Sequence, residues 1–128
     1  MGVTCIDAIV LGPTGKSQQV NFLVDSGAQY TLLPHDVWTA IELRPKRTQS
    51  FRLVDGTSID RSISECHIPL PQGDGHTPVI LGESGDDLAL LGVVMLEEFG
   101  LLLNPFNREL QPMQMLLWCT GDLVWTPI

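Results

Sequence analysis

The chain has 128 residues, 44% hydrophobic and 17% charged, so we expect residues 1–128 to form a single domain that buries its own core. The formal net charge is −8, and residues 62–128 hold nine acids against one base, so nucleic acids and anionic membrane surfaces are not expected as partners. Neither a signal peptide nor an apolar run near the ~20 residues of a membrane span is visible, so we expect a cytoplasmic protein without membrane insertion.

Frequent glycine and proline residues divide the first half of the chain into short segments. Apolar and polar side chains alternate in residues 3–11 and 20–24, on either side of a Gly- and Pro-rich turn, which predicts a β-hairpin. A third strand is expected at 30–33. A short helix is expected at 34–43, because Pro34 suits a first helical turn and an apolar stripe follows it.

A second hairpin is predicted next, with strands at 51–54 and 58–68 joined by the two-residue turn Asp55-Gly56. Residues 69–78 contain three prolines and two glycines and are expected to form a loop. The rest of the chain is expected to hold short apolar elements: strands at 79–81 and 88–91, a helix at 93–99, a strand resuming the sheet at 101–103, and two or three strands after residue 105. The predicted class is all-β, a closed or sandwiched barrel of short strands with one or two short helices.

The tripeptide Asp25-Ser26-Gly27 is the best candidate for chemistry. Asp-Ser-Gly alone is common turn material, but here it follows apolar residues 22–24 directly and precedes another apolar strand. A carboxylate between two buried strands requires a reason, because burying a charge is costly. An apolar strand meets a small-residue turn again at 88–92, and a short helix is expected after each copy. Only the first copy carries a carboxylate.

Two segments carry a family resemblance: Phe22 to Pro34, and Leu90-Leu91-Gly92 with Met95-Leu96 after it. In order and spacing they resemble the retropepsin-like (retroviral-type) aspartic proteases, a single-lobe group with cellular and bacterial relatives. The resemblance extends over roughly residues 3–104, with the second predicted hairpin in the place of the family's flap. It implies an acid-protease barrel that is active as a homodimer.

The resemblance implies that Asp25 is catalytic and that Ser26, Gly27 and Ala28 form the active-site turn. One chain supplies one Asp25, so a homodimer with both copies on its two-fold axis would provide the acid and the base together. One carboxylate would activate a water molecule, and the protonated one would hydrogen-bond the scissile carbonyl oxygen. The implied function is an aspartic endopeptidase acting on peptide or protein substrates.

The chain departs from the retroviral pattern at two positions. Those members usually have Arg after the glycine of the second motif and an acid four residues after the catalytic Asp, whereas this chain has Val93 and Gln29. Both partners of an ion pair are therefore missing together, and we expect dimer contacts and substrate specificity to differ. A catalytically weak or inactive module of the same fold, which dimerises or binds peptides, is the alternative function.

The implied flap turn, Asp55-Gly56, carries an acid and a single glycine. Two flaps would bring two Asp55 carboxylates together over the substrate. We expect them to repel each other near neutral pH, so that activity is highest in mild acid.

Neither a metal nor a cofactor is expected. The three histidines, His35, His67 and His76, are scattered, and none has a Cys or carboxylate at the spacing of a metal site. The three cysteines are an odd number without close spacing, and we expect them to be buried free thiols.

Overall fold

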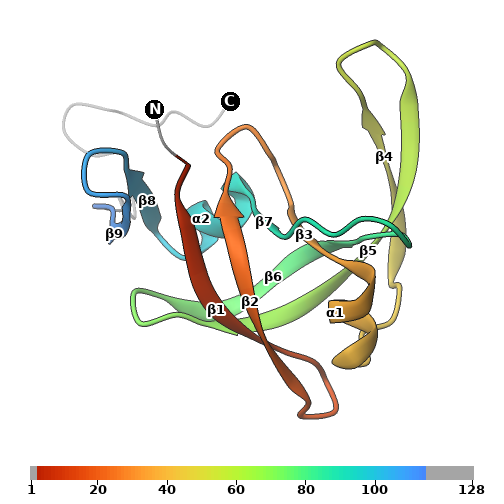
Figure 1. Ribbon diagram of the computed structural model, residues 1–128, viewed down its shortest axis with the longest axis horizontal. Coiled ribbons are helices and arrows are strands. Elements are labelled where there is room, and N and C mark those ends of the chain that lie inside the picture. Colours follow the sequence, from red (N-terminus) through yellow and green to blue (C-terminus); the bar gives the residue numbers. More distant parts are fainter. Residues whose placement is uncertain (1–2, 115–128) are drawn as a thin grey trace, which may run out of the picture.

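A computed structural model describes residues 3–114, which form mainly β-structure with two short helices (Figure 1). Their elements are β1 (Cys5–Leu11), β2 (Ser17–Val24), β3 (Thr31–Leu33), α1 (His35–Ala40), β4 (Arg47–Arg52), β5 (Ser58–Pro69), β6 (Asp74–Leu81), β7 (Leu90–Leu91), α2 (Val93–Glu98), β8 (Leu101–Asn104) and β9 (Glu109–Pro112). Within the described residues, seven strands form one sheet in the order β1-β2-β7-β3-β6-β5-β4, and β8 pairs with β9. The all-β prediction is confirmed.

The first hairpin and the first helix follow the predicted pattern. β1 and β2 pair from Cys5–Leu23 to Leu11–Ser17, and the inward-facing side chains of both strands are buried in the core. Helix α1 begins directly after Pro34 and is shorter than expected. It ends before Glu42, whose φ of 62° lies in the left-handed region and cannot continue a helix.

Strand β5 joins the two ends of the sheet. Its first half pairs with β4, its second half pairs with β6, and His67 also pairs with Leu11 of β1. This contact between β1 and β5 turns six strands into a ring, so the barrel is closed through a single residue pair. Because residues 58–62 pair with β4 alone, that part of the hairpin projects from the body of the molecule (Figure 1).

The prediction of a loop at 69–78 was wrong. β5 continues to Pro69, β6 starts at Asp74, and only a tight turn separates them. Gly73 and Gly75 are needed for packing, because a Cβ on either would come within 3.1 Å of Phe99. Pro78 lies just before the part of β6 that pairs with β3, so among residues 3–114 no strand pairs with this edge of residues 74–78 and proline breaks no ladder hydrogen bond there.

The C-terminal elements also differ from the expectation. Leu101–Asn104 pairs with Glu109–Pro112 in a separate two-stranded sheet and does not resume the main sheet. The expected strand at 88–91 is reduced to Leu90–Leu91. The other strands expected after residue 105 lie outside the described residues. No helix in residues 3–114 has the length and apolar composition to cross a membrane.

The core lies inside the ring of strands and is completed by α2. Met95 and Leu96 of α2 are buried together with Phe22 of β2 and Leu33 of β3. Leu91, the last residue of β7, is fully buried between them. The ends of β2 and β7 are therefore fixed by the core at the place where the candidate catalytic turn begins.

Candidate active site

Asp25 is the first residue after β2 and is half-buried. Its backbone N–H donates to the carbonyl oxygen of Leu91 (3.1 Å), and its own carbonyl accepts the N–H of Ala28 (3.1 Å). Its Oδ1 accepts the N–H of Gly27 at 2.9 Å. Within residues 3–114, Oδ2 has no hydrogen-bond partner. The turn therefore orients the carboxylate through one oxygen and leaves the other available.

The two halves of the internal repeat lie side by side. β2 and β7 are parallel, with Leu23 opposite Leu90 and Val24 opposite Leu91. After β7, the N–H groups of Val93 and Val94 donate to the carbonyl oxygens of Ala28 (2.8 Å) and Gln29 (2.9 Å). The second copy has no carboxylate, and its role here is to hold the turn that carries Asp25.

Gly92 sits at the tightest point of this contact. A Cβ there would lie 2.5 Å from the carbonyl oxygen of Gln29 and 2.5 Å from the carbonyl carbon of Tyr30. Its N–H donates to Oγ1 of the buried Thr31 (3.2 Å). The position accepts only glycine, because any side chain would push the segment after Asp25 away from β7.

The two positions that depart from the retroviral pattern are neighbours. Gln29 and Val93 belong to the segments joined by the backbone hydrogen bonds from Val93 and Val94. Neither side chain is ionisable, so the replacement leaves no unpaired charge beside the turn.

The hairpin predicted at the family's flap position is present as β4–β5 and is called the flap below, but its tip differs from the expected two-residue turn. The N–H of Leu53 donates to the carbonyl oxygen of Thr57 (2.7 Å), so three residues form the tip. Gly56 has a φ of 91°, which favours glycine. Asp55 and Gly56 thus lie at the tip as expected, together with Val54, which is fully exposed and which the sequence analysis missed.

The carboxylate of Asp55 bonds within its own turn. Oδ1 accepts the hydroxyl (2.6 Å) and the N–H (2.9 Å) of Thr57. These hydrogen bonds, the hydroxyl's first, hold the pKa of Asp55 below its ordinary value. Asp55 is exposed, but its carboxylate is bonded within the turn. The exposed apolar side chains at this end of the flap are Leu53 and Val54.

The base of the flap is attached to the segment that follows the candidate catalytic turn. The rings of Tyr30 and Phe51 meet edge to face with their centroids 5.9 Å apart. Nη2 of Arg47 donates to the Tyr30 hydroxyl (3.1 Å). Sequence analysis gave Arg47 no role and placed Tyr30 only in a strand. No local sequence pattern indicates this contact, because it joins segments that are distant in the chain.

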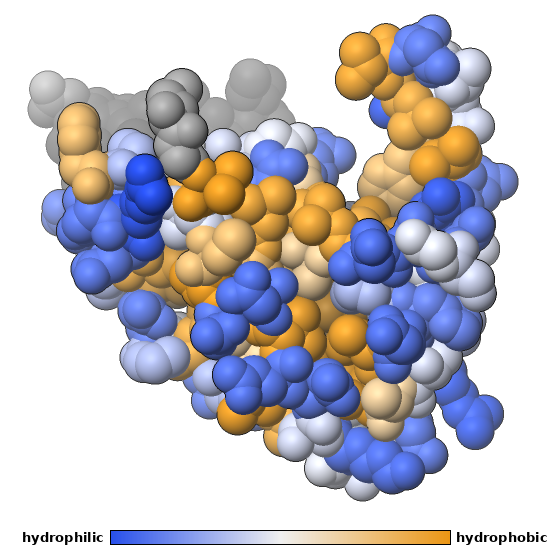
Figure 2. Space-filling model, in the orientation of Figure 1, coloured by the Kyte–Doolittle hydropathy of each residue, from blue (hydrophilic) through white to orange (hydrophobic). Residues whose placement is uncertain are grey.

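A cleft of about 590 Å³ lies beside the Asp25 turn, and Figure 2 shows the hollow between the projecting β4–β5 hairpin, the flap arm, and the body of the molecule. Gly27 and Ala28 form one part of its wall, and the flap arm forms another. Its remaining walls combine half-buried apolar side chains with charged ones: Leu32, Ile59, Ile80 and Leu90, and Arg52, Arg61 and Asp86. A cleft of this kind can hold the side chain of an extended peptide.

Comparison with known proteins decides the family. Residues 14–98, about two thirds of the chain, match the family model of the gag-polyprotein putative aspartyl protease. The chain belongs to this family. The matched range includes the Asp25 turn, the flap and Gly92, and it ends at the last residue of α2.

A solved structure agrees with the family. The EIAV protease complexed with the inhibitor HBY-793 has 19% sequence identity and a TM-score of 0.52, over 78% of this chain and 92% of that chain. This likeness shows a shared retroviral-protease fold, and the retropepsin-like resemblance is confirmed. A comparison with curated proteins finds no match.

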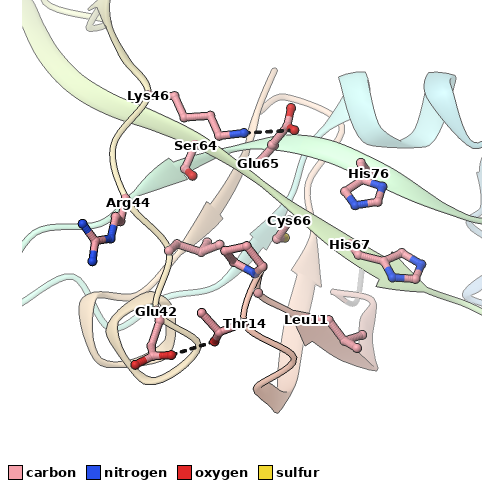
Figure 3. Close-up of a pocket in the computed structure, with 13 residues that line it drawn as sticks. Leu11, Thr14, Glu42, Arg44, Lys46, Ser64, Glu65, Cys66, His67 and His76 are labelled. Carbon is pink, nitrogen blue, oxygen red and sulfur yellow. Dashed lines mark hydrogen bonds and ion pairs between the residues drawn. The ribbon is translucent and has the colours of Figure 1, made fainter.

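This member of the aspartyl protease family has a second pocket of about 610 Å³, and no residue of the Asp25 turn lines it. Figure 3 shows the residues that line this second pocket. The histidines are not all scattered, because His67 and His76 pair across β5 and β6 with stacked rings 5.0 Å apart. Asp74 contacts His67. In the part of the chain that the structure describes, no three His, Cys, Asp or Glu side chains are grouped to hold a metal ion.

The cysteines do not share one environment. Cys66 lines the second pocket and is almost fully buried, and this burial raises the pKa of its thiol to about 12. It is therefore a poor nucleophile at neutral pH. Cys5 is exposed, which corrects the expectation that all three thiols are buried. Cys119 lies outside the described residues.

Proposed function

We propose that this chain is an aspartic endopeptidase in which two copies of Asp25, one from each subunit of a homodimer, form the catalytic site. The observation that carries the proposal is the turn after β2. It fixes Asp25 through Gly27 and β7 while leaving Oδ2 without a partner in residues 3–114. Membership of the aspartyl protease family supports the same reaction.

The chemistry follows from two carboxylates that share one proton, because like charges this close do not both ionise. The ionised Asp25 takes a proton from water, and the water oxygen attacks the peptide carbonyl carbon. The protonated Asp25 donates a hydrogen bond to the carbonyl oxygen, where negative charge develops. Proton transfer to the amide nitrogen then allows the C–N bond to break. No metal or cofactor takes part in this route.

The rest of the site assists this reaction by its shape. Gly27 lets the substrate approach the backbone closely, because glycine has no side chain. A Cβ added at this position would lie 3.2 Å from Oδ1 of Asp25. Ser26 is exposed beside it, where the family resemblance assigns it a hydrogen bond across the dimer. The flap would close over the substrate with its apolar tip residues, Leu53 and Val54.

The test is cleavage of an unfolded protein at pH 4–6, with and without a statine-type transition-state analogue. Asp25→Asn should lower the rate at least about 100-fold, because the amide cannot accept the proton of water. Asp36→Asn, which changes an exposed carboxylate on α1, is the matched control and should keep wild-type activity.

Circular dichroism and mass measurement should show that both variants keep the fold and the same assembly. Undiminished cleavage by the Asp25→Asn variant would remove Asp25 from the mechanism. Binding of the analogue by a wild-type protein that cleaves nothing would instead favour the peptide-binding alternative.

A further inference from the structure

Two pockets lie next to each other along the base of the flap. We name the cleft beside Gly27 and Ala28 the inner pocket and the neighbouring space of about 430 Å³, which Val94 also lines, the outer pocket. Both pockets are lined by Gln29, Tyr30, Phe51 and Arg52. The Tyr30–Phe51 ring pair therefore forms a common wall, and Arg52 can reach both sides of it.

The inner pocket suits an apolar side chain. Leu32, Ile80 and Leu90 line it. Two of its charged groups, Arg61 and Asp86, are engaged elsewhere, and the third, Arg52, lies on the wall that it shares with the outer pocket. Nη1 of Arg61 pairs with Oε1 of Glu83 at 3.2 Å. The carboxylate of Asp86 accepts the N–H of Glu83 at 2.8 Å.

The outer pocket suits an anion. Arg52 is the only charged side chain among the described residues that line it, and the other polar groups are the neutral side chains of Gln29, Gln49, Ser50 and Tyr30. Arg52 is exposed and forms no ion pair or side-chain hydrogen bond within residues 3–114. The nearby acid Asp60 accepts the Ser50 hydroxyl (2.5 Å) and does not line the pocket. An unpaired guanidinium beside neutral donors favours a carboxylate.

The adjacency of the two pockets suits an extended peptide. Alternate side chains of a β-strand point to the same side about 6.7 Å apart. The rings of Tyr30 and Phe51 line both pockets, so the pockets are direct neighbours along the flap. Side chains two positions apart can therefore enter the two pockets. Because Gly27 and Ala28 line the inner pocket only, its occupant is closer to the scissile bond.

We propose that Arg52 selects substrates in which an acidic residue lies two positions outward from an apolar residue that fills the inner pocket. The inference rests on the proposed peptidase function and names the substrate class of that site. A symmetric dimer holds two such pocket pairs, so the preference applies on both sides of the cleaved bond.

Matched peptides that differ only by Glu or Gln at the outer position test the proposal. Wild-type protein should have a kcat/KM about two- to five-fold higher for the Glu peptide, the effect of one exposed ion pair, and added salt should reduce the ratio. Arg52→Gln should bring the ratio to about one, and Arg52→Glu should invert it because like charges repel. Arg44→Glu reverses an exposed charge that lines only the second pocket and should leave the wild-type ratio.

Binding of the same peptides to Asp25→Asn protein separates this proposal from the peptidase proposal. If binding shows the Glu preference and no variant cleaves, the outer pocket stands and the catalytic proposal fails. If wild-type protein cleaves both peptides and the Glu-to-Gln ratio is equal in wild type, Arg52→Glu and Arg44→Glu, the role of Arg52 is overturned. Equal binding of both peptides by a protein that cleaves neither would overturn both proposals.

Discussion

Gly92 has no functional group, yet the position of the Asp25 turn depends on it. Its backbone φ of −97° is open to any residue, so the constraint is steric and comes from the carbonyl groups of Gln29 and Tyr30. Gly92→Ala should lower the free energy of unfolding by about 3 kcal/mol and reduce peptidase activity, because the segment after Asp25 must move.

Gly15→Ala is the matched control for this prediction. Gly15 has a φ of 90° and open space around it, so alanine there should cost about 1 kcal/mol through backbone strain alone. Activity should stay at the wild-type level. Urea denaturation and the peptidase assay measure the two effects, and a Gly92→Ala variant as stable and active as Gly15→Ala would disprove the steric role.

Single residues of the site were predictable from sequence to different degrees. Asp25 could be singled out as a candidate because an Asp-Ser-Gly turn between two apolar strands has few structural explanations. Sequence analysis missed Val54, Tyr30 and Arg47, because their contacts and exposure depend on which segments the fold brings together. The T-shaped contact of Tyr30 with Phe51 joins residues 21 positions apart, and sequence alone does not show such a contact.

The flap turn is an element whose behaviour with pH follows from Asp55. Hydrogen bonds from Thr57 lower the pKa of Asp55 relative to the unfolded chain. Its contribution to the turn is therefore complete above the unfolded pKa of about 3.9 and is lost as the pH falls through the lower folded value. We expected mild acid to relieve the repulsion between two Asp55 carboxylates. Because the pKa of Asp55 is lowered, this relief requires a more acidic pH than expected.

Hydrogen exchange of residues 51–59 tests this element directly. After correction for the intrinsic exchange rate, the protection of the Thr57 amide against hydrogen exchange should stay constant from pH 7 to pH 5 in the wild type. Asp55→Ala should lose that protection, whereas Asp55→Asn should keep part of it, since the amide oxygen still accepts a hydrogen bond. Protection that declines steadily between pH 7 and pH 5 would contradict the lowered pKa.

Strands were predictable where side chains alternate, and the misassigned elements have identifiable causes. β1 and β2 alternate clearly and form the expected hairpin. The β5–β6 hairpin was hidden because prolines and glycines usually indicate a loop, whereas Gly73 and Gly75 here make room for Phe99. The pairing of Leu101–Asn104 with Glu109–Pro112 was missed because an apolar strand does not reveal its partner.

The whole chain has a strongly acidic composition, whereas Arg52, which lines the cleft, has no ion-pair partner in the part of the chain that the structure describes. The net charge of −8 is spread mainly over residues 62–128, whereas Arg52 and Arg47 come from the flap arm. An acidic substrate is thus repelled by the molecule at long range and attracted at one position. Salt screens both effects, so the outer-pocket preference must be measured as a ratio between matched peptides and not as an absolute rate.

Peptidase activity should depend on protein concentration, because each subunit supplies only one Asp25. Specific activity should fall on dilution below the dimer dissociation constant and should remain constant above it. Since Gln29 and Val93 offer no ion pair and two chains of net charge −8 repel each other, added salt should strengthen the dimer modestly. Activity and mass in solution, measured over about a thousandfold dilution at low and high salt, check both statements. Constant specific activity throughout would exclude a shared site, and a dimer weakened by salt would show that other ion pairs hold it together.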